Sequence, residues 1–117
     1  MSDDIRSLKK IVYSVRLSGK KYILATDKYV ALQNYISDNI HTFDMYIIRH
    51  NEKIFDIRGN KGLILFDFHN RLDKMISDVS NIFSSHSGTI IAISHPVIKQ
   101  YGVIDRFSEY VNIINQE

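Results

Sequence analysis

Two short stretches of the chain place ionisable and polar side chains directly after apolar segments. Asp67, His69 and Asn70 follow the run Leu63–Phe66, and Ser94-His95 follows Thr89–Ile93. Carboxylate, imidazole, amide and hydroxyl groups serve in proton transfer, metal binding and hydrogen-bonded recognition. In open α/β sheets, ligands collect at the carboxyl ends of strands. If both apolar segments are strands of one sheet, these side chains therefore stand where binding or chemistry is expected.

The same residues allow a metal-dependent reaction. Asp67, His69 and His95 would make a three-ligand set, the minimum for an open metal site. The Asp-x-His pattern at Asp67 is also similar to that of metallophosphoesterases, in which both side chains bind metal. The sequence offers no identifiable fourth ligand, so no metal and no cofactor is assigned. In the competing interpretation, Asp67 and Asn70 cap a helix and the two histidines are separate surface residues.

Covalent catalysis has little support in this sequence. The chain of 117 residues contains no Cys, which excludes thiolate nucleophiles, thiolate metal sites and disulfides. None of its serines stands in a G-x-S-x-G turn of the kind that exposes a nucleophile. No catalytic residue is therefore assigned.

Positive charge is concentrated at the amino terminus. The formal net charge is +2, and it divides into +4 for residues 1–28 and −2 for the remainder. Basic side chains with interspersed tyrosines can hold phosphates and stack bases. Nucleic-acid binding is therefore an alternative function, with contacts expected at Lys10, Arg16, Lys20 and Lys21. The competing interpretation is that these side chains solubilise the edge of a sheet.

The elements expected in the first half of the chain are two hairpins separated by a helix. Residues 10–17 alternate, and Ser18-Gly19 separates them from Lys21–Thr26, which predicts a β-hairpin. A helix follows, capped by Thr26 or Asp27, with its apolar stripe at Tyr29, Leu32, Ile36 and Ile40. Segments 43–49 and 53–58 predict a second hairpin.

The second half predicts a parallel unit. Leu63–Phe68 and Thr89–Ile93 are apolar runs typical of buried strands, and a helix from Asn70 to Phe83 joins them. Strands joined by such a crossover lie parallel. Ser94-His95-Pro96 begins a last helical region that runs to the end of the chain. The fold class expected is α/β (mixed α+β) in one domain, residues 1–117. Its single mixed sheet has about six strands, with N-terminal antiparallel hairpins and a C-terminal parallel β-α-β-α unit.

Residues 63–107 resemble the second half of STAS-type domains, the anti-sigma-antagonist-like regulators. The shared features are an apolar strand ending in Asp67, a helix, the strand Ile90–Ile93, and a final helical region containing Gly102. The resemblance implies a non-catalytic domain that switches partner proteins, in some members through a phosphorylated Ser. This chain has Phe68-His69-Asn70-Arg71 where that Ser would stand. The longin/roadblock scaffold, which has the order β-β-α-β-β-β-α, fits residues 10–84 as well.

The function expected is therefore that of a small non-enzymatic regulatory or adaptor domain that binds another protein or a second copy of itself. Its interaction surface is expected at Asp67, His69, Asn70, Arg71, Ser94 and His95. Nucleic-acid binding is the alternative, and a metal-dependent phosphoesterase is the further one. No apolar run approaches the roughly 20 residues of a membrane span, and the acidic start does not resemble a signal peptide. A cytoplasmic protein without membrane contact is expected.

Overall fold

The computed structural model describes residues 2–49, 52, 59–70, 81–100 and 112–116. Four helical elements and five strands are defined among them. The helices are α1 (Ser2–Val15), α2 (Tyr29–Asp38), α3 (Ile40–Phe43) and the 3-10 helix η1 (Pro96–Gln100). The strands are β1 (Lys21–Thr26), β2 (Tyr46–Ile48), β3 (Leu63–Leu65), β4 (Ile90–Ser94) and β5 (Asn112–Gln116). Short helical segments at 68–70 and 81–85 lie between β3 and β4.

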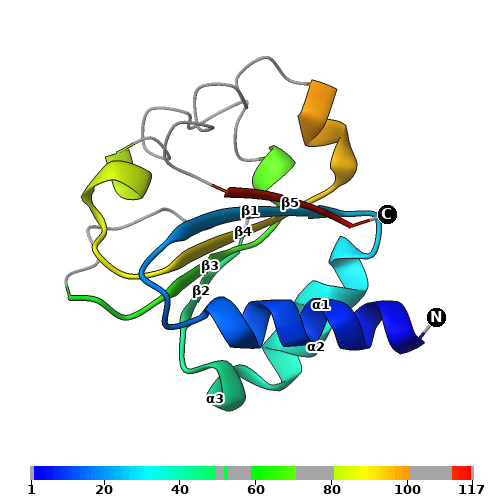
Figure 1. Ribbon diagram of the computed structural model, residues 1–117, viewed down its shortest axis with the longest axis horizontal. Helices are drawn as coiled ribbons and strands as arrows, with labels where there is room; N and C mark the ends of the chain where they lie inside the picture. The colour runs from blue at the N-terminus through cyan, green and yellow to red at the C-terminus, as the bar shows by residue number, and fades with distance from the viewer. Residues whose placement is uncertain (1, 50–51, 53–58, 71–80, 101–111, 117) are drawn as a thin grey trace.

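The five strands form one sheet in the order β2-β3-β4-β1-β5. Every pairing is parallel, with Leu63 opposite Ile90 and Tyr22 opposite both Ile91 and Asn112. Figure 1 shows α1, α2 and α3 on one face of the sheet and the helical segments that follow β3 and β4 on the other. The described part of the chain is thus a three-layer α/β arrangement.

Alternation along the strands divides the core between these two faces. Leu24, Ile64 and Ile91 pack with Leu8 and Val12 of α1 and with α2 and α3. Their strand neighbours Ile23, Leu63, Leu65, Ile90 and Ala92 pack on the opposite face with Phe68, Phe83 and Ile98. Because both faces are covered, β3 and β4 are apolar at nearly every position, as expected for buried parallel strands. The two runs of buried strand residues therefore reflect burial on both sides.

The predicted N-terminal hairpin is wrong, because its first half is the helix α1. Ile5, Leu8, Val12 and Val15 recur at helical spacing and face the core, with Leu8 and Val12 at most 2% exposed. The competing alternation would have buried Tyr13 and Leu17, which are 46% and 81% exposed. Both periods are present in the sequence, and burial against α2 and the sheet selects the helical one. Gly19, at φ +72°, makes the turn from α1 into β1.

The expected mixed sheet of about six strands with antiparallel hairpins is also wrong. β2 spans only Tyr46–Ile48 and pairs in parallel with β3 instead of forming a hairpin. Its proposed hairpin partner, residues 53–58, lies outside the described residues. At the other end of the chain, Ile114 lies in β5 and not in a terminal helix. Residues 101–111, where that helix was predicted, also lie outside the description.

Other elements are confirmed. β1 has the predicted bounds Lys21–Thr26, and α2 buries Leu32 and Ile36 of the predicted stripe. The predicted parallel pairing of the two apolar segments is found between β3 and β4. Among the described residues, no helix combines the length and the apolar composition needed to cross a membrane.

Candidate functional site

The carboxyl ends of β1 and β4 form a topological switch point. β1 is followed by α2 on one face of the sheet, whereas β4 is followed by η1 on the other (Figure 1). The two strands are neighbours, paired from Lys21 opposite Ile90 to Ala25 opposite Ser94. Where adjacent strands send their connections to opposite faces, the chain leaves a crevice in which parallel sheets bind ligands. The candidate site is therefore sought at this edge.

Four side chains meet at the switch point. The His69 and His95 ring centroids are 6.0 Å apart, and the Tyr29 ring lies edge-on to both, at 5.0 Å and 5.8 Å. Ser94 Oγ lies 3.3 Å from His69 Nδ1. His69 is 7% exposed and Ser94 is fully buried, while Tyr29 and His95 are half-buried. Of the polar residues that the sequence places after the two apolar segments, the structure brings His69, Ser94 and His95 together.

Hydrogen bonds fix the proton position on both histidines. The His95 backbone N–H donates to His69 Nδ1 at 3.1 Å, and the Val97 N–H donates to His95 Nδ1 at 2.9 Å. A nitrogen that accepts a hydrogen bond carries no proton, so each neutral ring holds its proton on Nε2. His95 thereby caps the first turn of η1. Both rings are left with an Nε2–H donor.

Burial decides the charge of His69. Desolvation lowers the pKa of His69; Asp67 opposes this shift and His95 reinforces it. Because desolvation is the largest of these effects, His69 is neutral at pH 7. The centre of the site therefore holds an uncharged imidazole.

Asp67 is held in an uncommon backbone conformation. Its φ of +52° lies in the left-handed region, which Asp tolerates better than most residues. Its N–H donates to Gln33 Oε1 at 2.8 Å, and its carbonyl accepts the Asn70 N–H at 2.9 Å. Gln33 is 7% exposed. A buried amide of α2 therefore fixes the turn that carries Asp67 out of β3.

Sequence reasoning missed Tyr29 and Gln33 as site residues. They are one helical turn apart in α2 and lie beside the buried stripe of Leu32 and Ile36. A polar side chain bordering an apolar stripe is a signal of a buried hydrogen bond. The sequence therefore contained a sign that these side chains are buried. It did not show that α2 lies at the carboxyl ends of β3 and β4.

The geometry does not favour the metal interpretation. Nδ1 of both histidines is occupied by a backbone donor, and Nε2 is consequently protonated. Metal ligation needs a free lone pair on the ring. Within the described ranges, no group of three or more His, Cys, Asp or Glu side chains is arranged to hold a metal ion.

Ser94 is equally unsuited to nucleophilic attack. Its side chain is fully buried, and its hydroxyl donates to the His95 carbonyl at 2.9 Å. His69 Nδ1 already accepts the His95 N–H, so it is not free to take the hydroxyl proton. The Asp67, His69 and Ser94 set therefore lacks the free base and accessible nucleophile of a catalytic triad.

The remaining predicted residues are dispersed. Asn70 is exposed beside the site, and Arg71 lies outside the described residues. Of the basic residues assigned to a hairpin, Lys10 is on α1, Arg16 and Lys20 are in the turn, and Lys21 begins β1. Lys21 Nζ donates to the Gly88 carbonyl at 2.7 Å, and burial lowers its pKa. The hairpin on which the nucleic-acid interpretation depended does not exist.

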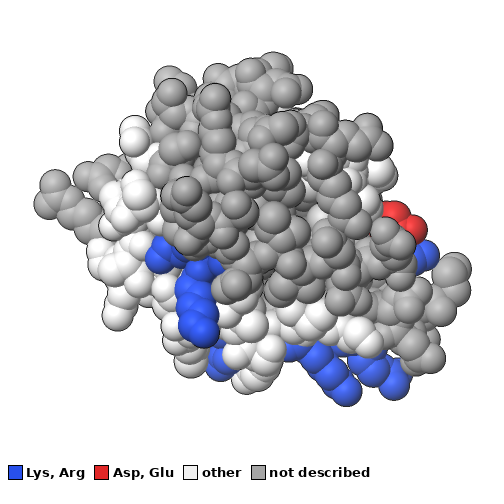
Figure 2. Space-filling view, turned by 45° about the horizontal axis from the view of Figure 1, so that its top comes forward, with Lys and Arg blue, Asp and Glu red and all other residues white. Residues whose placement is uncertain are grey.

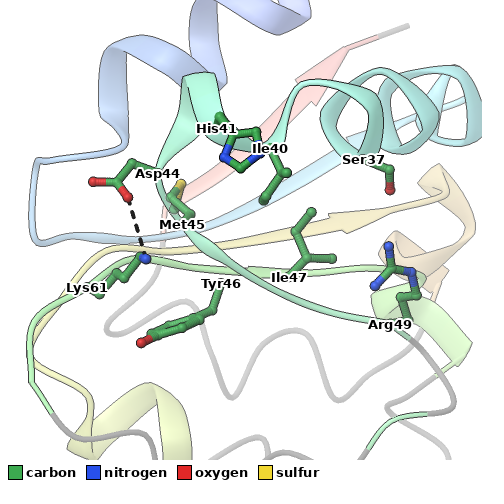
Figure 3. Close-up of a pocket in the computed structure, with 9 residues that line it drawn as sticks. All are labelled: Ser37, Ile40, His41, Asp44, Met45, Tyr46, Ile47, Arg49 and Lys61. Atoms are coloured by element: carbon green, nitrogen blue, oxygen red, sulfur yellow. Dashed lines mark ion pairs between the residues drawn. The ribbon is translucent and has the colours of Figure 1, made fainter.

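A separate pocket of about 460 Å³ opens along the edge strand β2. Figure 3 shows its lining from the end of α2, from α3, from β2 and from Lys61. Lys61 Nζ lies 3.4 Å from Asp44 Oδ1, and Arg49 lies 3.6 Å from Glu52. Because each cation has a carboxylate partner, this pocket offers little unpaired charge to an ionic ligand.

Comparison of the chain with protein-family models, with curated proteins and with solved structures finds no match.

Proposed function

We propose that this chain is a small non-enzymatic regulatory or adaptor domain that binds another protein at the carboxyl ends of β1, β3 and β4. The contact surface is formed by Tyr29, Asp67, Asn70 and His95, which we call the carboxyl-end surface. The supporting observation is the convergence of His69, Ser94 and His95 with both Nδ1 atoms engaged. In this arrangement neither histidine Nδ1 is free to act as a base and the Ser94 hydroxyl is buried, which favours holding a partner over transforming one.

The chemistry of this surface suits a polypeptide. His95 provides an Nε2–H donor, and Asp67 and Asn70 provide acceptors and an amide. Backbone and side-chain groups of a protein partner offer both complements. Tyrosine is enriched among the residues that dominate binding energy, since its ring and hydroxyl act together. Because the buried bonds of His69 and Gln33 fix these groups beforehand, little ordering entropy is lost on binding.

A site-specific photo-crosslinker tests the proposal. Placed at the exposed position Asn70, it should give one defined protein adduct in a lysate of the source cells. The matched control is the same crosslinker at Lys20, which is also exposed but lies at the amino end of the sheet. The adduct from Asn70 should fall at least about fivefold when His95→Gln or Asp67→Asn is introduced.

Two results would contradict the proposal. Equal adducts from Asn70 and Lys20 would indicate contact without a preferred surface. An Asn70 adduct unchanged by His95→Gln and Asp67→Asn, in variants with wild-type thermal midpoints, would remove these side chains from the interface. An adduct with the mass of two chains would identify the partner as a second copy.

A further inference from the structure

A second hollow lies on the helical face of the molecule, away from the carboxyl-end surface. It is an open, shallow hollow of about 400 Å³ between α1, α2 and α3. Its apolar lining consists of Tyr13, Tyr35 and Phe43. The Phe43 ring packs edge to face with the rings of Tyr13 and Tyr35, at centroid distances of 6.4 Å and 6.2 Å. Tyr13 is 46% exposed although it belongs to this aromatic cluster. We call this hollow the aromatic groove.

Cations surround the aromatic groove. Lys9 and Lys10 line it, and the Arg16 guanidinium lies 3.9 Å from the centre of the Tyr13 ring. None of these three side chains forms an ion pair with a carboxylate among the described residues. Figure 2 shows several of the Lys and Arg side chains along the lower edge of the view, whereas the acidic side chains visible in it lie at the right-hand edge. An apolar hollow with unpaired positive charge at its rim is complementary to an acidic partner.

We propose that the aromatic groove is a second docking site, which takes an acidic segment of a partner protein through one aromatic or aliphatic anchor side chain. The anchor enters among Tyr13, Tyr35 and Phe43. Carboxylates on either side of it pair with Lys9, Lys10 and Arg16. Burial of the large apolar side chain stabilises the complex, and the charged rim sets the orientation and raises the association rate.

The contacts favour a peptide over a nucleic-acid base. A base would need an open aromatic face on which to stack. Lys9 Nζ already lies 4.2 Å from the centre of the Tyr35 ring, and Arg16 covers Tyr13 while donating to the Tyr13 carbonyl at 3.0 Å. A carboxylate can pair with the outward N–H groups of these cations without displacing either from its ring.

This inference goes beyond the proposed function, because it uses other residues on another face. Together the two surfaces would let one small domain hold two partners at once, as an adaptor requires. The two surfaces share no residue, so an experiment can disprove the proposal for one without affecting the proposal for the other.

Fluorescence anisotropy with defined probes tests the aromatic groove. The first probe is a labelled nine-residue peptide of Glu and Asp with a central Leu-Phe pair. The second replaces that pair by Ser-Ser, and the third is a nine-nucleotide oligothymidylate. We expect saturable binding of the first peptide at least about tenfold tighter than that of the second, since the anchor contributes over 1.4 kcal/mol. The changes in backbone amide chemical shift on adding the peptide should be largest around Tyr13, Tyr35 and Phe43.

A pair of charge reversals separates docking from general attraction. Lys10→Glu and Lys20→Glu change the net charge equally at exposed positions, but only Lys10 lines the groove. Lys10→Glu should weaken binding of the Leu-Phe peptide at least about tenfold, and Lys20→Glu less than about twofold. His95→Gln should leave this binding unchanged, which distinguishes the groove from the carboxyl-end surface.

Several outcomes would overturn the inference. Equal loss of peptide binding in Lys10→Glu and Lys20→Glu would reduce the interaction to non-specific electrostatics. Tighter binding of oligothymidylate than of the Leu-Phe peptide would assign the groove to nucleic acid. The absence of NMR shifts at the groove with millimolar Leu-Phe peptide, or concentration-dependent dimers that Tyr13→Ser abolishes, would exclude an acidic partner as its occupant.

Discussion

His69 and His86 are buried to nearly the same extent at opposite ends of the sheet, 7% and 5% exposed, yet their surroundings differ. His69, at the carboxyl ends of the strands, accepts the His95 N–H and contacts Tyr29 and Ser94. His86, before β4, donates from Nε2 to the Lys61 carbonyl at 2.8 Å, and its buried Nδ1 has no hydrogen-bond partner. The first joins groups from three elements into a site. The second connects two loops.

Gly88 shows a further difference between the two ends of the sheet. Near His86 the loops approach so closely that a Cβ on Gly88 would meet the Asn60 backbone and the His86 ring. At the carboxyl end, polar side chains fill the corresponding space between the strand ends. The amino end of the sheet is thus packed for loop-to-loop contact, whereas the carboxyl end is built from side chains that can present hydrogen-bonding groups. Burial of a histidine alone therefore does not identify a functional site.

The largest expected loss of stability comes from a substitution at the amino end of the sheet. In Gly88→Ala the new Cβ would overlap the Asn60 carbonyl oxygen, a backbone atom that cannot rotate away. We expect a loss of about 3 kcal/mol in the free energy of unfolding, the upper range for overpacking. Urea denaturation measures it, with Ser87→Ala at the adjacent exposed position as the control. A loss below about 1 kcal/mol would show that the two loops separate easily.

Replacing each histidine by leucine compares the two ends directly. His69→Leu leaves the partly buried His95 N–H without its acceptor, which we expect to cost about 2 kcal/mol in the free energy of unfolding. His86→Leu removes the unpartnered Nδ1 and leaves only a carbonyl of the exposed Lys61, so it should cost less than about 1 kcal/mol. Chemical denaturation of both variants gives the difference. Equal losses in the free energy of unfolding would mean that the two histidines contribute equally to stability.

The pH dependence of stability tests the neutral state of His69. Its pKa is lowered in the folded protein, chiefly by desolvation, so the unfolded chain binds a proton first as the pH falls below about 6.5. Stability should therefore decrease between pH 7.5 and 5, and this decrease should be smaller in His69→Leu. Urea midpoints measured across this range provide the check. A wild-type and a variant curve of the same slope would contradict the assigned shift.

The smallest expected effect lies again at the amino end. Lys21→Met keeps the aliphatic stem but removes the hydrogen bond from Nζ to the Gly88 carbonyl. We expect a loss of about 0.5–1 kcal/mol, the usual net contribution of one hydrogen bond. Lys20→Met, at the neighbouring exposed position, should change the thermal midpoint by less. If Lys21→Met matched its neighbour, the bond to Gly88 would contribute nothing measurable.

Much of the carboxyl-end site was predictable. Asp67, His69, Ser94 and His95 were singled out because each follows an apolar run, and parallel neighbouring strands end at the same edge of a sheet. Tyr29 and Gln33 were not expected there. Their placement requires β1 to be the neighbour of β4, a pairing between residues about 70 positions apart that no local pattern encodes. The resemblance of residues 63–107 to STAS-type domains, and the shared function that it implies, stay a prediction.

The amino-terminal region shows why local patterns fail. Residues 5, 8, 12 and 15 fit a helix, while 11, 13, 15 and 17 fit a strand, and both periods occur in the same segment. The choice depends on which set of side chains finds an apolar surface, and the packing of Leu8 and Val12 against α2 and the sheet provides it. The absence of an N-terminal hairpin then removes the main source of the expected antiparallel pairing.

Local sequence patterns were enough to predict the buried strands β3 and β4 and the polar residues that follow them, because burial on two faces requires continuous apolar runs. The sequence also excluded every role for cysteine. The strand order, the parallel pairing of the five described strands and the helical state of residues 2–15 depend on tertiary packing. So do the proton positions on His69 and His95, which follow from backbone donors of the neighbouring strand end and the first turn of η1. These features depend on contacts between distant segments, whose free energies local periodicity does not contain.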